Sequence, residues 1–99
     1  IFIILFFMTK VKNINGTSRF PAPLGYKSWL DYWEKQTGKK AYYCGASGCF
    51  RSDLVGAHVM KANSLDNHYY ITPLCSKCNQ RRDEFYVTTE LVPVPSRLG

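Results

Sequence analysis

Two short cysteine pairs constrain the fold of this chain more than any other feature of its sequence. The first pair is Cys44 and Cys49, the second is Cys75 and Cys78, and 25 residues separate them. Two close pairs on separate turns can supply four thiolates to a tetrahedral zinc ion, and the two glycines inside the first pair allow a sharp turn around it. Two local disulfides are the alternative. Because the sequence shows no export signal, we expect a reducing compartment and a structural zinc.

The length and composition narrow the class of protein further. A chain of 99 residues with 45% hydrophobic residues predicts one small folded domain, for which a bound metal would offset a modest core. The formal net charge of +6 favours a polyanionic partner, although a solvated basic surface without a partner is the alternative. Four thiolates around one dication lower this charge but leave the chain basic.

The first eight residues, IFIILFFM, are apolar. They fall far short of the roughly 20 residues that span a bilayer, and they lack the flanks of a signal peptide. We therefore expect no membrane partner and a cytoplasmic location. We also expect Met8 to be the true start, with residues 1–7 not native; a buried edge strand is the alternative for this stretch.

The prolines and aromatic residues divide the chain into three parts. Residues 1–26 read as an extension and loop, residues 27–87 as a zinc-binding domain with a leading helix, and residues 88–99 as an extended tail. The leading helix is predicted from Ser28 to Thr37, with Ser28 as its N-cap and Gly38 ending it. Its buried stripe would pack on the metal module and consists of Trp29, Tyr32 and Trp33.

Strand composition marks two further segments, residues 53–61 and 69–74. The first cysteine pair is expected to form a turn between two short strands. The polar segment over residues 76–85, SKCNQRRDEF, predicts a helix of two to three turns that opens at the second pair. The fold class is therefore a small α+β domain with a treble-clef-like zinc core.

The order of these segments resembles the HNH, or ββα-metal, endonucleases, and among them the type held together by a four-cysteine zinc. The residues that carry the resemblance are GAHV at 56–59, YITPLC at 70–75 and CSKCN at 75–79. It covers about residues 42–86. The family implies two antiparallel strands followed by a crossing helix, and a divalent cation such as Mg²⁺ that assists phosphodiester hydrolysis.

The resemblance also implies roles for individual residues. His58 takes the place of the general base, and Asn79 that of the residue that binds the catalytic cation. Asp83 lies four residues further on, so on a helix it would share a face with Asn79 and could add an oxygen ligand. Many members carry a metal-binding Asp or His just before the base, where this chain has Ala57. A packed structural histidine is the alternative for His58.

Basic residues lie along the predicted helix over residues 76–85 and at both ends of the predicted strand over residues 53–61. Phosphate contacts are predicted for Arg51, Lys61, Lys77, Arg81 and Arg82. Such contacts would bind nucleic acid, with DNA as the expected partner, without reading its sequence. A solvated basic face is the alternative.

Two functions follow from the sequence. The first is a metal-dependent DNA endonuclease or nickase with a structural zinc, a catalytic cation and no small-molecule cofactor. The second is a catalytically inactive zinc module that binds nucleic acid or protein. The sequence leaves the oligomeric state open.

Overall fold

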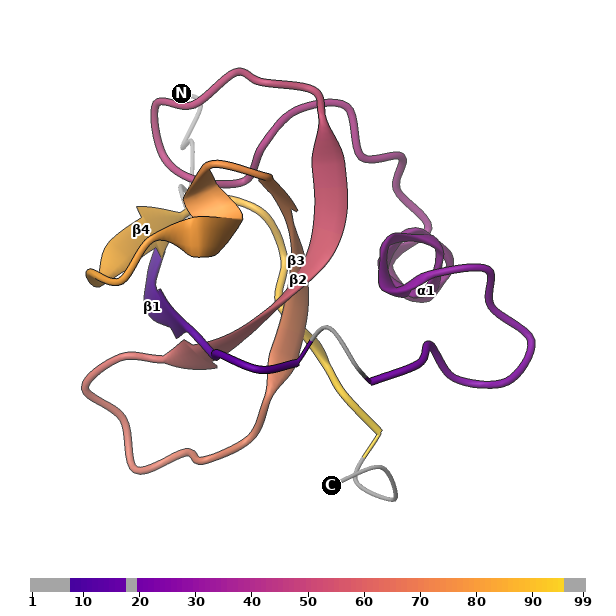
Figure 1. Ribbon diagram of the computed structural model, residues 1–99, viewed down its shortest axis with the longest axis horizontal. Coiled ribbons are helices and arrows are strands. Elements are labelled where there is room, and N and C mark those ends of the chain that lie inside the picture. Colours follow the sequence, from indigo (N-terminus) through magenta and orange to yellow (C-terminus); the bar gives the residue numbers. More distant parts are fainter. Residues whose placement is uncertain (1–7, 18–19, 96–99) are drawn as a thin grey trace, which may run out of the picture.

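The computed structural model describes residues 8–17 and 20–95, so the expectations for residues 1–7 lie outside the described residues. Five antiparallel strands form one sheet in the order β4–β1–β2–β3–β5 (Figure 1). The strands are β1 (Thr9–Asn13), β2 (Leu54–Lys61), β3 (Tyr70–Cys75), β4 (Phe85–Val87) and β5 (Val92–Pro93); the helices are α1 (Trp29–Thr37) and the short 3₁₀ helix η1 (Cys78–Gln80). The predicted α+β class is confirmed, whereas the treble-clef arrangement remains a prediction.

The hairpin of β2 and β3 is the centre of the fold. Its register places Leu54 opposite Cys75 and Val59 opposite Tyr70. Every residue of β3 is buried, because α1 covers one face of the hairpin and the other strands cover the opposite face (Figure 1). A strand that is buried on both faces has a largely apolar sequence without alternation, and YITPLC is of this kind.

The turn at the first cysteine pair joins the two sides of the curled sheet. The Gly45 N–H donates to the Pro73 carbonyl of β3 at 2.7 Å, while the Ser47 N–H donates to the Tyr86 carbonyl of β4 at 2.9 Å. Ala46 forms a single β-bridge with Val87. The strands and this turn therefore enclose a small core, whose fully buried members include Val11, Val59, Leu74 and Val87.

Helix α1 forms where its capping residues and aromatic stripe predict it. The Asp31 N–H donates to the Ser28 hydroxyl at 3.0 Å, and Gly38 ends the helix with a φ of 71°. Its three buried aromatic residues pack with Ile71 and Val92 on the outer face of the hairpin, in a core cluster separate from the one that contains the cysteines. In the described part of the chain no helix has the length and apolar character needed to cross a membrane.

Gly56 of β2 lets α1 approach the hairpin closely. A Cβ atom at this position would lie 2.5 Å from the backbone nitrogen of Leu30 and 2.5 Å from the backbone carbonyl carbon of Trp29. These contacts are with backbone, which cannot turn aside as a side chain can. The start of the helix therefore rests directly on the strand.

The helix predicted over residues 76–85 is wrong. The chain forms only the single turn of η1, after which Arg81 is extended (φ −64°, ψ 140°) and β4 begins at Phe85. Phe85 and Val87 are buried with an exposed Tyr86 between them. This alternation of buried and exposed side chains is that of a β-strand. Pairing with β1 outweighs the helical preference of the polar residues before it.

The sheet extends beyond the predicted zinc-binding domain at both ends. The supposed N-terminal extension contains β1, which lies between β2 and β4 in the sheet. The supposed tail contains β5, which pairs with β3. The polar sequence TKVKN places only Val11 in the core, so its strand character comes from its two neighbours rather than from its own composition.

Candidate metal centre

The four cysteines meet at one point. Cys44 and Cys49 come from the turn before β2, Cys75 ends β3 and Cys78 begins η1. Their sulfur atoms all lie within 4.8 Å of one another, and those of Cys49 and Cys75 are 3.8 Å apart. A tetrahedron with Zn–S bonds of about 2.3 Å has sulfur–sulfur edges of about 3.8 Å, whereas a disulfide needs about 2.05 Å. All four are free thiols, so the geometry fits a metal and not disulfides.

Backbone hydrogen bonds orient these sulfurs. The Cys75 N–H donates to the Cys44 sulfur at 3.2 Å, and the Cys78 N–H donates to the Cys75 sulfur at 3.3 Å. The turn is held in place by the Cys44 N–H, which donates to the Arg51 carbonyl at 2.8 Å. Donors aimed at sulfur favour the thiolate form, which is the form that binds metal.

The titration of the thiols depends on the balance of burial and hydrogen bonding. Burial raises the pKa of Cys44, and raises that of Cys78 to about 12. Burial also opposes ionisation of Cys75, but the Cys78 N–H and the neighbouring thiols outweigh it and lower the pKa of Cys75. A bound dication would deprotonate all four thiols. Four thiolates would fill its coordination shell, so the centre would stabilise the fold and leave no position open for chemistry.

Asn13 braces this centre from β1. Its side-chain amide donates to the carbonyls of Cys78 and Arg81, each at 2.9 Å. The polar side chain thereby holds the turn of η1 against the sheet. No local pattern predicts this contact, because Asn13 and Cys78 lie 65 positions apart in the sequence.

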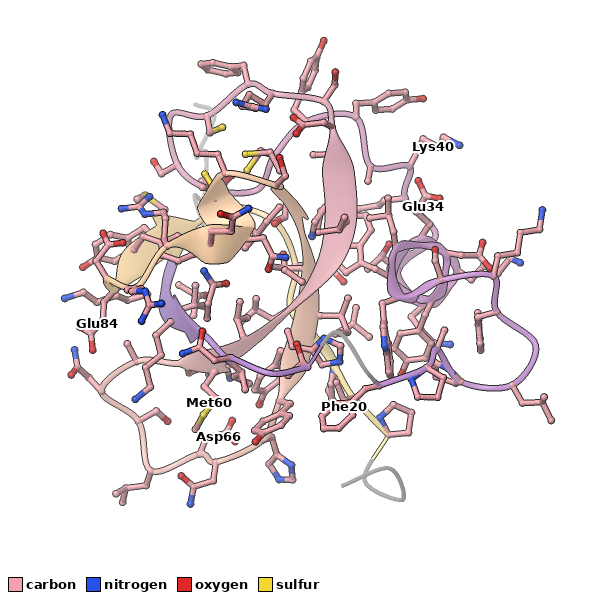
Figure 2. The ribbon with its side chains drawn as sticks, in the orientation of Figure 1. Phe20, Glu34, Lys40, Met60, Asp66 and Glu84 are labelled. Carbon is pink, nitrogen blue, oxygen red and sulfur yellow. The ribbon has the colours of Figure 1, made fainter. Side chains whose placement is uncertain are left out.

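His58 lies on the other side of the hairpin, within β2 rather than at its end. It is only 5% exposed, and its ring packs edge-on against Trp29 and Phe20 at centroid distances of 4.8 and 6.1 Å. Figure 2 shows Phe20 on the α1 side of the strand. Burial lowers the pKa of His58 below its ordinary value. Its Nε2 atom has no hydrogen-bond partner among the described residues.

The structure does not bring His58 together with the residues expected to bind the catalytic cation. Asn79 is exposed on η1, which lies on the opposite side of the hairpin from α1 (Figure 1). Since no long helix forms, Asn79 and Asp83 share no helical face. The Asp83 carboxylate instead pairs with the Arg81 guanidinium through contacts of 2.9 and 2.5 Å, which lowers its pKa. Ala57 points away from His58 into the core.

Three of the five predicted phosphate contacts are already engaged within the chain. Arg51 pairs with Asp53 at 2.9 Å. Lys61 lies 3.8 Å from the Asp66 carboxylate and over the Tyr70 ring, and Arg81 pairs with Asp83. Lys77 and Arg82, both exposed beside η1, form no ion pair with any described residue.

Comparison with known proteins adds no relative. A scan against protein-family models found no match, and searches of curated proteins and of solved structures found none either. The likeness to HNH endonucleases therefore remains a prediction from short motifs.

Sequence reasoning missed three exposed aromatic residues beside the first cysteine pair. Tyr42, Tyr43 and Phe50 are 67%, 61% and 80% exposed. Their position next to Cys44 and Cys49 in the sequence was the available signal, because a turn around a metal leaves its flanking side chains little core to enter.

Proposed function

We propose that this chain is a non-catalytic, zinc-stapled domain that binds nucleic acid. The observation that carries the proposal is the distribution of its charges. Six of its seven acidic residues are paired with a Lys or Arg of the chain, and the seventh, Glu34, accepts a hydrogen bond from the Ala41 N–H at 2.8 Å. The surplus positive charge is thus left on side chains without a carboxylate partner.

The described cations outside these ion pairs are Lys12, Lys27, Lys40, Lys77 and Arg82. Lys77 and Arg82 flank η1, which the metal centre and Asn13 hold in place. A rigid turn that presents two unpaired cations suits phosphate binding, because little conformational entropy is lost on contact.

The position of His58 supports a binding module rather than an enzyme. A general base must come within hydrogen-bond reach of the proton that it removes. The His58 ring is enclosed by Trp29 and Phe20, and the expected cation ligands lie across the sheet. The four-cysteine centre has no open coordination position to substitute for them.

Binding to labelled duplex DNA over a series of salt concentrations tests the proposal. The double variant Lys77→Ala, Arg82→Ala should bind more weakly on unrelated sequences and should lower the salt slope by about two, because two phosphate contacts are lost. Lys27→Ala is the matched control, since it removes an unpaired cation just before α1, on the far side of the hairpin from η1. Absence of wild-type binding at low salt to both duplex DNA and a single strand would refute the proposal.

The endonuclease implied by the resemblance is the second candidate. One observation favours it: a neutral His58 with an unpartnered Nε2 is in the protonation state of a general base. Incubation with supercoiled plasmid and Mg²⁺, Mn²⁺ or Ni²⁺ tests it. Cleavage that His58→Ala abolishes while zinc is retained would establish the enzyme and overturn the non-catalytic proposal.

A further inference from the structure

A hollow of about 330 Å³ lies beside the metal centre. Three of its apolar lining residues are buried: Trp33 and Ala46 are each 3% exposed, and Pro73 is fully buried. Tyr42, Tyr43 and Phe50 line the same hollow but are largely exposed, so they form its rim. The hollow thus has an apolar base and an aromatic edge.

The exposure of these rings is costly in water. Large apolar side chains that stay exposed next to one another mark a surface that meets a partner. The three rings flank cysteines that the metal would fix in position, so they are presented on a rigid frame. Preorganised aromatic faces lose little entropy when another flat group stacks on them.

One cationic side chain at this hollow favours a partner that combines flat rings with negative charge. Lys40 lines it and forms no ion pair with a described residue, and no described lining residue is Asp or Glu. Cys44 and Cys49 also line the hollow, and around a bound dication they would carry thiolate charge, so the phosphate contact is assigned to Lys40 at the rim. Figure 2 shows Lys40 near Glu34, but the Glu34 carboxylate accepts from the Ala41 N–H. An apolar peptide could pack against the rings but would offer no anionic group to the lysine. A nucleic-acid strand supplies flat bases for the rings and a phosphate for the lysine.

We propose that this hollow is a stacking site for an unpaired base of a single nucleic-acid strand, with Tyr42, Tyr43 and Phe50 as its aromatic rim and Lys40 as its phosphate contact. The inference rests on the proposed function and adds the form of nucleic acid that this surface takes. Duplex bases are already stacked on one another, so they cannot enter the hollow. Ring faces do not read the 2′-hydroxyl, so DNA and RNA strands should bind alike.

Fluorescence anisotropy with labelled oligothymidylate, oligouridylate and a DNA duplex tests the site. Tyr43→Ala and Phe50→Ala should each weaken single-strand binding by roughly fivefold or more, because stacking on one ring contributes about 1–3 kcal/mol. The same variants should leave duplex binding unchanged. Tyr86→Ala, which removes an exposed ring of β4 outside the hollow, is the matched control.

A second measurement reports directly on the rim. Phe50→Trp should keep wild-type affinity, and the introduced indole should be quenched by the single strand but not by the duplex. Zinc content confirms that each variant is folded. A wild type that binds neither nucleic acid would overturn both this site and the proposed function. A wild type that binds duplex and single strand equally, with the alanine variants unaffected, would overturn the stacking site and leave the proposed function standing.

Discussion

At the scale of single residues, the environment of His58 depends on its pairing with β3 and on its packing against α1. GAHV places a histidine on the expected strand, but the direction of its side chain depends on the strand's register with β3. Opposite Ile71, whose side chain belongs to the aromatic cluster under α1, His58 faces the helix and not η1. Packing from Trp29, nearly thirty residues earlier in the chain, then determines whether the ring meets solvent or core.

Burial of His58 predicts a dependence of stability on pH. Because its folded-state pKa lies below the ordinary value of 6.5, the unfolded chain binds a proton that the folded chain excludes. The free energy of unfolding should therefore fall as the pH drops below about 6.5, by up to roughly 1.4 kcal/mol per pH unit from this group. Urea titrations at a series of pH values give the free energy of unfolding of wild type and of His58→Gln. The difference between the two free energies should change as the pH falls below about 6.5.

Both proteins would lose zinc in acid to the same extent, so this loss cancels when their free energies of unfolding are subtracted. His68→Gln is the matched control, because it removes an exposed imidazole without touching the packing against Trp29. Parallel curves for wild type and His58→Gln from neutral pH to pH 5 would contradict the assignment.

At the scale of elements, the close contact between α1 and β2 makes Gly56 a sharp test of the packing. An added Cβ would meet the backbone of Leu30 and Trp29, and relieving that overlap costs about 1–3 kcal/mol. Replacing a flexible glycine gains only about 0.5–1 kcal/mol, so the steric overlap outweighs it and the substitution is destabilising. Gly56→Ala should lower the free energy of unfolding and shift the fluorescence of the helix tryptophans.

The neighbouring substitution Val55→Ala provides the control, since Val55 is 40% exposed and should cost little. A Gly56→Ala protein as stable as wild type, with unchanged tryptophan emission, would show that α1 does not rest on β2 as described.

Elements differ in how far the sequence predicts them. The sequence predicts α1 because Ser28, Gly38 and the aromatic stripe are local signals, and the cysteine site because its spacing reports directly on ligand geometry. It does not predict β1, β4 or the short η1. Those segments acquire their structure from partners more than fifty residues away: Asn13 bonds to carbonyls of the metal turn, and Val11 pairs with Phe85. Contacts between such distant residues produce no hydrophobic periodicity within the segments themselves, so a local pattern cannot predict them.

At the scale of the whole molecule, the metal centre joins the turn before β2 to the end of β3 and the start of η1. We expect metal analysis to find about one zinc per chain, and a chelator or Cys75→Ser to unfold the domain, because in a core of this size metal-binding energy is folding energy. Circular dichroism and a denaturation curve measure the loss. Ser47→Ala, an exposed change in the same turn, is the control.

A folded, zinc-free protein with two disulfides would be the contrary result. The sulfur separation of 3.8 Å between Cys49 and Cys75 argues against it, since that distance suits neighbouring ligands of one ion and not a bond.

The place of β1 in the sheet has a consequence for synthesis on the ribosome. Thr9–Asn13 is the first described strand to leave the exit tunnel, yet one of its neighbours, Phe85–Val87, is among the last. Residues 54–78, which contain the hairpin and the second cysteine pair, emerge before β4, and β1 keeps one open edge until residue 87 has emerged. The sheet is therefore completed only after β4 has emerged, and until then the polar sequence of β1, with its lysines, disfavours pairing of its open edge with other strands.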